Sequence, residues 1–251
     1  MKDIIEIPAL ANVHTHLREG DIVGPLIERA IEGGSDVLLP MPNTTVGLTT
    51  AELVMNYIST IRRSNLLSEK IRFIPTVMIT EGTTETDIDQ CLENGIRDGK
   101  IYPRDRTTKS ESGVRCYGRI LPIIKHCGEV GMKVHLHPEH PSTLFNNRDA
   151  EFLFLPIAMM YIEETMAQII WEHGSDARCI PFWERMAVTN KFFVTLTAHH
   201  LATNEDETFG DVGATCKPPI KTESDRCGLL NFIAKNHNWV MAGGDDAFHD
   251  A

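Results

Sequence analysis

The sequence has no apolar segment long enough to cross a membrane and no run of lysine and arginine residues. Its most apolar stretch, residues 152–162, is interrupted by Pro156 and is far shorter than the roughly 20 residues that a membrane-spanning helix needs. Residues 1–6 do not resemble a signal peptide. The net charge of −11 argues against nucleic acids and anionic membranes as partners, so an anionic substrate would have to be held by local arginines.

The six cysteines form no Cys-x-x-Cys pair. In a chain of 251 residues without such pairs, cysteines are typically reduced thiols of a cytoplasmic protein. We therefore predict a cytoplasmic location and mostly packing roles for these thiols, with Cys216 as an exception.

A glycine-rich turn after the first predicted strand is also absent, which disfavours a doubly wound, dinucleotide-binding sheet. Apolar β-type runs instead alternate with amphipathic helical patterns, as in parallel βαβ units. Eight strands and seven helices predict an α/β fold, a single-domain (β/α)8 TIM-type barrel over residues 1–251 with its last helix missing. The predicted strands are 8–13, 36–40, 71–78, 99–102, 132–137, 168–172, 192–197 and 239–243, and the predicted helices are 23–32, 50–64, 85–94, 117–130, 149–166, 175–187 and 222–235.

Metal-binding residue types gather at the predicted strand ends, where such barrels keep their active sites. The first strand leads into His14 and His16, which share one face because a strand has a side-chain period of two. One such His-x-His pair is weak evidence, because 11 histidines give about half an occurrence by chance. The later strand ends add Lys100, His137, His173 and Asp245. Imidazoles and carboxylates are ligands of divalent metals, and a buried lysine can lose its proton and form a carbamate with carbon dioxide.

Each of these residues also has an ordinary interpretation. A single histidine is as often structural, Lys100 alone would be a surface lysine, and Asp245 alone could cap a helix. His135 and His140 compete with His137 for the ligand role. We favour His137 because it shares a face with His135 and lies nearer the end of the strand. Asp246 competes with Asp245, and a second carboxylate beside an anion site would be unfavourable unless it points away.

Together these motifs resemble the dihydroorotases of the amidohydrolase superfamily, most closely the shorter bacterial-type enzymes. The resemblance extends over essentially the whole chain. The motifs that carry it are His14-Thr-His-Leu-Arg18, Met41-Pro-Asn-Thr44, Lys100-Ile-Tyr-Pro103, Thr107-Thr108, residues 131–139, Trp171-Glu-His173 and residues 245–249. Three features depart from the family: Pro138 follows His137, Asp246 follows Asp245, and the family's chain continues beyond residue 251, which predicts an incomplete barrel with an exposed apolar strip.

The resemblance implies two Zn²⁺ per chain, bridged by carboxylated Lys100 and a hydroxide. His14, His16 and Asp245 would bind one zinc, and His137 and His173 the other. Asp245 would also be catalytic, moving a proton from the hydroxide to the departing ring nitrogen. The substrate would be bound by Arg18, Asn43, Ala247 and His249, by Thr107 and Thr108 on a mobile loop, and by the backbone around Cys216 and Lys217.

The reaction implied is the interconversion of L-dihydroorotate and N-carbamoyl-L-aspartate, in a homodimer that works in pyrimidine biosynthesis. Another cyclic amidohydrolase, such as a hydantoinase or dihydropyrimidinase, is an alternative. Arg18 and Asn43 argue against it, because a neutral ring gives an arginine no anion to pair with. A non-catalytic paralogue that serves as a structural partner and a mononuclear metal-binding module also remain open.

Overall fold

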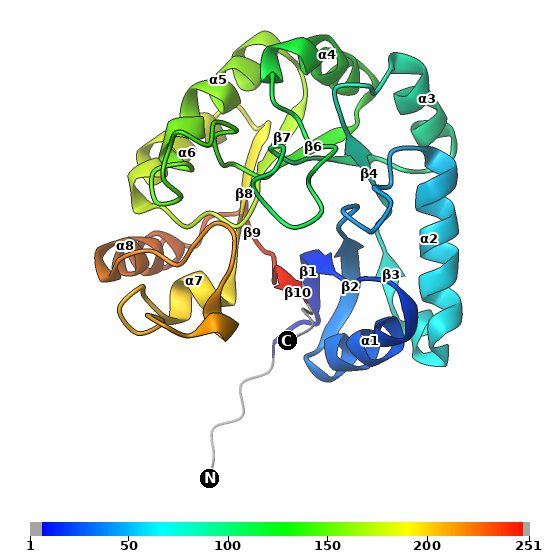
Figure 1. Cartoon of the computed structure of the whole chain (residues 1–251), viewed down its shortest axis with the longest axis horizontal. Coiled ribbons are helices and arrows are strands. Elements are labelled where there is room, and N and C mark those ends of the chain that lie inside the picture. Colours follow the sequence, from blue (N-terminus) through cyan, green and yellow to red (C-terminus); the bar gives the residue numbers. More distant parts are fainter. Residues whose placement is uncertain (1–6, 248–251) are drawn as a thin grey trace.

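The computed structural model describes residues 7–247 and confirms the predicted α/β class. Parallel strands lie inside and the helices surround them (Figure 1). The strands are β1 (Leu10–His16), β2 (Ser35–Pro40), β3 (Arg72–Phe73), β4 (Thr76–Ile79), β5 (Asp98–Ile101), β6 (Lys133–Leu136), β7 (Gln168–Trp171), β8 (Phe192–Leu196), β9 (Val240–Ala242) and β10 (Asp246–Ala247). The helices are α1 (Val23–Glu32), α2 (Ala51–Ser64), α3 (Glu85–Glu93), α4 (Leu121–Val130), α5 (Leu155–Glu164), α6 (Ile180–Ala187), α7 (Ala198–Ala202) and α8 (Glu223–Ile233).

The strands form two parallel sheets, in the orders β10-β1-β2-β3 and β4-β5-β6-β7-β8-β9. The single strand predicted over residues 71–78 is divided into β3 and β4, which belong to different sheets. Pro75 stands between them, and proline has no N–H to donate to a strand ladder. At the other junction the backbone N–H of Asp245 donates to the carbonyl of His14 over 2.9 Å. This bond ties the segment after β9 to β1.

Local sequence signals explain where several helices begin and end. Helices α3 and α8 start with capping boxes, formed by Thr84 with Asp87 and by Thr222 with Asp225. Helix α4 ends at Gly131, whose φ of 78° is a left-handed conformation that glycine adopts without strain. Helix α7 was not predicted, since five residues are too few to show a helical period.

Aromatic packing outside the second sheet fixes β7, the strand that leads into His173. Trp171, the last residue of β7, is fully buried and lies 6.0 Å, centroid to centroid, from both Phe182 and Trp183 of α6. Its Nε1 donates to Glu151 over 3.1 Å. Because Trp171 is held from two sides, the two residues that follow it leave the strand in a defined direction.

No helix in the described part of the chain is both long and apolar enough to cross a membrane. Within residues 7–247 the short strand β10 follows β9. It pairs with β1 through Thr15 and His16, so it brings the residues after Asp245 alongside the first histidine pair.

Candidate metal and substrate site

The strand ends bring together all six residues predicted as metal ligands. His14 and His16 come from β1, Lys100 from β5, and His137, His173 and Asp245 from the segments that follow β6, β7 and β9. The Oδ1 atom of Asp245 lies 3.2 Å from Nε2 of His14 and 3.1 Å from Nε2 of His16. Ligand atoms of His14, His173 and Asp245 all lie within 4.8 Å of one another.

The second pair of histidines completes the cluster. Nε2 of His173 lies 3.0 Å from Nδ1 of His137, and the ring centroids of His14 and His173 are 5.1 Å apart. Burial holds the pKa of His173 well below its ordinary value and also lowers the pKa of His137. Burial lowers the pKa of His16 to about 4. These three imidazoles are therefore neutral near pH 7, the form in which histidine binds a metal.

Lys100 is fully buried in the same cluster, and its Nζ has no hydrogen-bond partner among residues 7–247. Burial lowers the pKa of Lys100 to about 8, against the charges of Glu172 and Asp245, which raise it. A buried amine without hydrogen bonds is costly unless another group satisfies it. Its lowered pKa makes the neutral amine, which reacts with carbon dioxide, more accessible.

This donor set fits a pair of divalent metals. It offers the neutral imidazoles of His16, His137 and His173, the imidazole of His14, whose pKa the nearby Asp245 and Glu172 raise, the carboxylate of Asp245, and the amine of Lys100, which would become an anionic carbamate. Burial raises the pKa of Asp245, but its interactions with His14, His16 and His173 together outweigh that effect, and the net pKa is well below the ordinary value. The carboxylate is therefore ionised in the pH range where His16, His137 and His173 are neutral.

Three predicted site residues have a left-handed backbone conformation, which non-glycine residues adopt rarely. The φ angles are 58° for Arg18, 38° for His173 and 51° for Asp245. Hydrogen bonds hold the last two, since the N–H of His173 donates to Oγ1 of Thr195 over 2.7 Å and that of Asp245 to the His14 carbonyl. Strain of this kind is typical of functional sites, where the surrounding structure fixes it.

A second layer of buried polar residues holds the first histidine. Oε2 of Glu172 lies 2.9 Å from Nδ1 of His14 and accepts a hydrogen bond of 2.6 Å from Thr195. Oε1 of Glu172 is hydrogen-bonded to Nδ1 of His135. Nε2 of the same ring lies 3.0 Å from Oδ1 of Asp98. His135 therefore faces Glu172 and Asp98, one layer away from the cluster. The sequence did not predict that Glu172, Thr195 and Asp98 support the histidines through hydrogen bonds. Its only signal for this layer was the two-residue period of β6, which places His135 on the same face as His137.

The competing residues also have defined places. His140 is partly exposed, and its Nδ1 accepts from the Ser142 N–H over 3.1 Å. Asp246 points to β1, where its carboxylate accepts from Asn12 over 2.8 Å and from Thr15 over 2.7 Å. Asp246 is thus held away from the histidines, in the arrangement that makes a second carboxylate tolerable.

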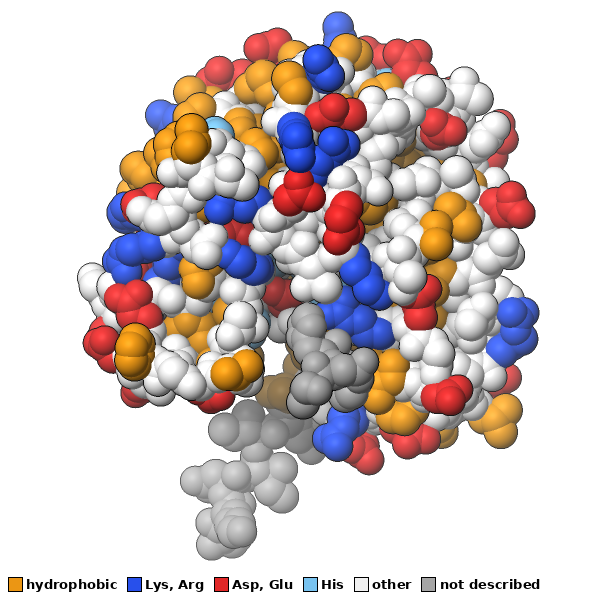
Figure 2. All heavy atoms as spheres, in the orientation of Figure 1, with side chains coloured by type: hydrophobic (Ala, Val, Ile, Leu, Met, Phe, Trp, Pro, Cys, Tyr) orange, Lys and Arg blue, Asp and Glu red, His pale blue; other side chains and the backbone are white. Residues whose placement is uncertain are grey.

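A cavity of about 840 Å³ opens above the cluster. The face shown in Figure 2 carries small groups of lysine and arginine side chains interspersed with acidic ones. Asn43 is fixed in the cavity wall, because its Nδ2 donates to the Thr108 carbonyl over 3.0 Å and its Oδ1 accepts from Tyr102 over 3.0 Å. The lining includes the predicted substrate-binding residues Arg18, Asn43, Thr107, Thr108, Cys216, Lys217 and Ala247, as well as His16, His199 and Asp245. The remaining one, His249, lies outside the described residues.

Barrel strands whose ends present histidines, a buried lysine and an aspartate define the class of metal-dependent amidohydrolases. The comparisons give the particular family. The chain is 31% identical to a probable dihydroorotase of Schizosaccharomyces pombe over 98% of this chain and 72% of that protein. It is 30% identical to the dihydroorotase of Mycosarcoma maydis, covering 98% of this chain and 62% of that protein. The chain belongs to the dihydroorotase family.

Solved structures agree with this assignment. Dihydroorotase from Saccharomyces cerevisiae, solved in complex with 5-fluoroorotic acid, superimposes with a TM-score of 0.89 at 27% identity, over 97% of this chain and 71% of that one. An L-hydantoinase from Arthrobacter aurescens gives a TM-score of 0.81 at 14% identity, over 95% of this chain and 57% of that one, which shows a shared fold alone. A scan against family models found no match.

Proposed function

We propose that this chain is a dihydroorotase that interconverts L-dihydroorotate and N-carbamoyl-L-aspartate with two Zn²⁺ bound. The observation that carries the proposal is the convergence of buried Lys100 with four histidines and Asp245 beneath a cavity lined by Arg18 and Asn43. His14, His16 and Asp245 would hold one ion and His137 and His173 the other, with carboxylated Lys100 between them. The family membership of the chain supports the same activity.

The metals, when bound, lower the pKa of water and polarise a carbonyl group. Asp245 is ionised and can take up a proton from the attacking water. It can then donate that proton to the ring nitrogen as the cyclic amide opens. Its position beside both His14 and His16 keeps the carboxylate at one place during this transfer.

Arg18 would orient the substrate by pairing with its carboxylate. Arg18 lies two residues after the end of β1 and has a left-handed backbone, and the Tyr57 hydroxyl donates to its carbonyl over 2.8 Å. These constraints fix where its side chain leaves the backbone at the cavity wall. A hydantoinase activity is the weaker candidate, because a neutral ring offers no carboxylate to this guanidinium.

The homodimer, like the metals, is part of this proposal and is supported by the resemblance alone. A cytoplasmic location is proposed as well, and the six cysteines, all free thiols in the structure, support it.

The test is metal analysis combined with an assay of L-dihydroorotate ring opening. The zinc-loaded chain is expected to hold two Zn²⁺ in the cluster and to open the ring. A chain that binds no zinc in zinc-replete buffer and leaves dihydroorotate intact would favour a non-catalytic paralogue. One metal that is retained when Lys100 is removed, but lost when His14 is removed as well, would favour a mononuclear module.

A further inference from the structure

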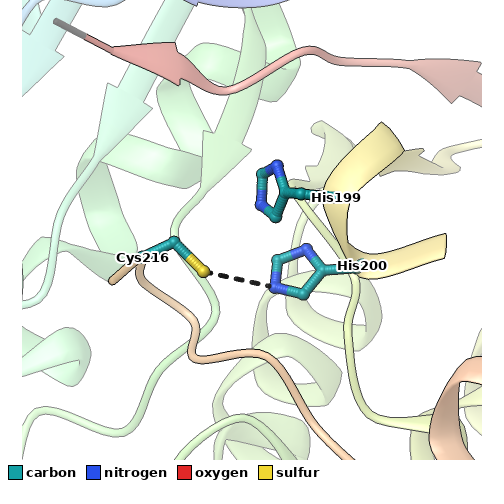
Figure 3. A group of neighbouring side chains, drawn as sticks. All are labelled: His199, His200 and Cys216. Atoms are coloured by element: carbon teal, nitrogen blue, oxygen red, sulfur yellow. Dashed lines mark hydrogen bonds between the residues drawn. The ribbon is translucent and has the colours of Figure 1, made fainter. Parts of the chain in front are cut away.

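A second group of metal-binding side chains lies beside the cavity, outside the six residues already described. His199 and His200 belong to α7, and Cys216 lies on the loop that precedes α8 (Figure 3). A ligand atom from each of the three lies within 4.8 Å of the other two. The Sγ atom of Cys216 points toward Nε2 of His200 at 4.0 Å.

The hydrogen bonds of these three residues would still allow their nitrogen and sulfur atoms to bind a metal. Nε2 of His200 and Sγ of Cys216 each lie 3.1 Å from the same acceptor, the carbonyl oxygen of Pro218. Nδ1 of His200 lies 2.6 Å from Oγ1 of Thr197, which can accept a hydrogen bond from an Nδ1–H and so leave the Nε2 lone pair available. Nε2 of His199 is buried and has no hydrogen-bond partner among residues 7–247. A metal would satisfy that nitrogen.

We propose that His199, His200 and Cys216 form a third, thiolate-containing site for a divalent metal of the zinc type. One sulfur and two imidazole nitrogens match the ligands of Zn²⁺. Tetrahedral zinc bonds of about 2.0 to 2.3 Å place such donors roughly 3.5 Å apart, so a small rotation of Cys216 closes the observed 4.0 Å. Binding releases the thiol proton to solvent, shifts the His200 proton to Nδ1, and needs no oxidant.

The position of this site suggests what it would influence. His199 and Cys216 line the same cavity as Arg18 and Asn43. An ion held by them would fix the loop around residue 216 against α7, at the wall where the proposed substrate lies. The inference does not depend on the proposed activity, because the ligands of the two centres are different residues.

Cobalt provides a selective probe, because the six predicted ligands of the main centre include no sulfur. Only a site that contains a thiolate gives a near-ultraviolet sulfur-to-cobalt charge-transfer band. The purified full chain is titrated with Co²⁺ in the background C116S/C227S, which removes both exposed thiols and leaves the buried ones and Cys216. The charge-transfer band is expected in this background and is expected to disappear when Cys216→Ser is added.

His199→Ala is the second variant. The side chain of His199 is partly exposed, so its removal should disturb folding less than a substitution in the loop that carries Cys216. It is expected to weaken the cobalt affinity reported by the band at least about tenfold, through loss of one of three ligands. His126→Ala, which removes a histidine paired with Asp89 at the surface, is the matched control and is expected to keep the affinity. Absence of the band, its persistence after Cys216→Ser, or an unchanged affinity in His199→Ala would overturn the proposal. Loss of this site would leave the two metal equivalents of the main centre in place.

Discussion

Oδ1 of Asp98 lies 3.0 Å from Nε2 of His135, and the other ring nitrogen of His135 is hydrogen-bonded to Glu172. Glu172 in turn lies 2.9 Å from His14. A chain of buried hydrogen bonds therefore runs from a residue at the start of β5 to a proposed metal ligand on β1. Partners of this kind fix the ring orientation and tautomer of a metal-binding histidine.

Asp98→Ala should weaken zinc binding about 10- to 100-fold, the range typical for loss of an outer partner of a metal ligand. Zinc affinity is measured by competition with a chelator. Asp89→Ala is the matched control, because Asp89 is an exposed residue of α3 that pairs with a histidine outside the cluster, His126, over 2.8 Å. A drop in thermal stability with unchanged zinc affinity would show that the Asp98–His135 pair is merely structural.

The six predicted metal ligands could be identified in the sequence because each lies at or just after the end of a predicted strand. His14 and His16 follow from the strand period, and Lys100, His173 and Asp245 from their places at later strand ends. The second layer was not predictable in this way. His135 of β6 and Glu172, the residue after β7, for example, are 37 positions apart, and only the side-by-side pairing of β6 with β7 brings them together.

In the fold, too, features with a local sequence pattern were predicted and features that depend on strand pairing were not. The predicted alternation of strands and helices is confirmed, and α1 has the bounds that the pattern gave. The break between β3 and β4 and the two-residue strand β10 were not predicted. Pro75 gives the only local signal for the break. β10 depends on its pairing with β1, which no local pattern encodes.

Lys100→Ala should abolish dihydroorotate ring opening and lower the zinc content, since it removes the proposed bridge between the two ions. Activity and zinc per chain are measured on the same preparation. Lys125→Ala, an exposed position on α4, is the control and should change neither. Full activity in Lys100→Ala would exclude the bridging carbamate.

Arg18→Met should lower kcat/KM for dihydroorotate about 10- to 100-fold, mostly through KM, because a charge-assisted hydrogen bond contributes about 1.5–3 kcal/mol. Steady-state kinetics on both variants provide the measurement. Arg29→Met, an exposed position on α1, should leave both constants unchanged. An unaltered KM in Arg18→Met would remove Arg18 from the carboxylate site.

Glu151 should make the stability of the metal-free protein depend on pH. Burial raises the pKa of this carboxyl from 4.5 to about 7, so between these pH values the folded state holds a proton that the unfolded state has lost. Its contribution is therefore fully present below about pH 4.5 and is lost as the pH rises through 7. The loss amounts to about 3 kcal/mol.

Glu151→Gln mimics the protonated form, because its amide can donate to Ser175 while its oxygen accepts from Trp171. In urea unfolding at pH 5 to 8, the free energy of unfolding of this variant should fall less with pH than that of the wild type. Glu163→Gln, an exposed position on α5, should follow the wild type. Parallel curves for all three proteins would contradict the assignment of this pH dependence to Glu151.

The most direct test of the account compares L-dihydroorotate with dihydrouracil as substrates of the zinc-loaded chain. The two rings differ by the carboxylate that Arg18 is proposed to bind. We predict that kcat/KM for dihydroorotate exceeds that for dihydrouracil by at least about 100-fold, about the discrimination that one buried charged contact provides. Equal turnover of the two substrates, or no turnover of dihydroorotate with two zinc ions bound, would contradict the central claim.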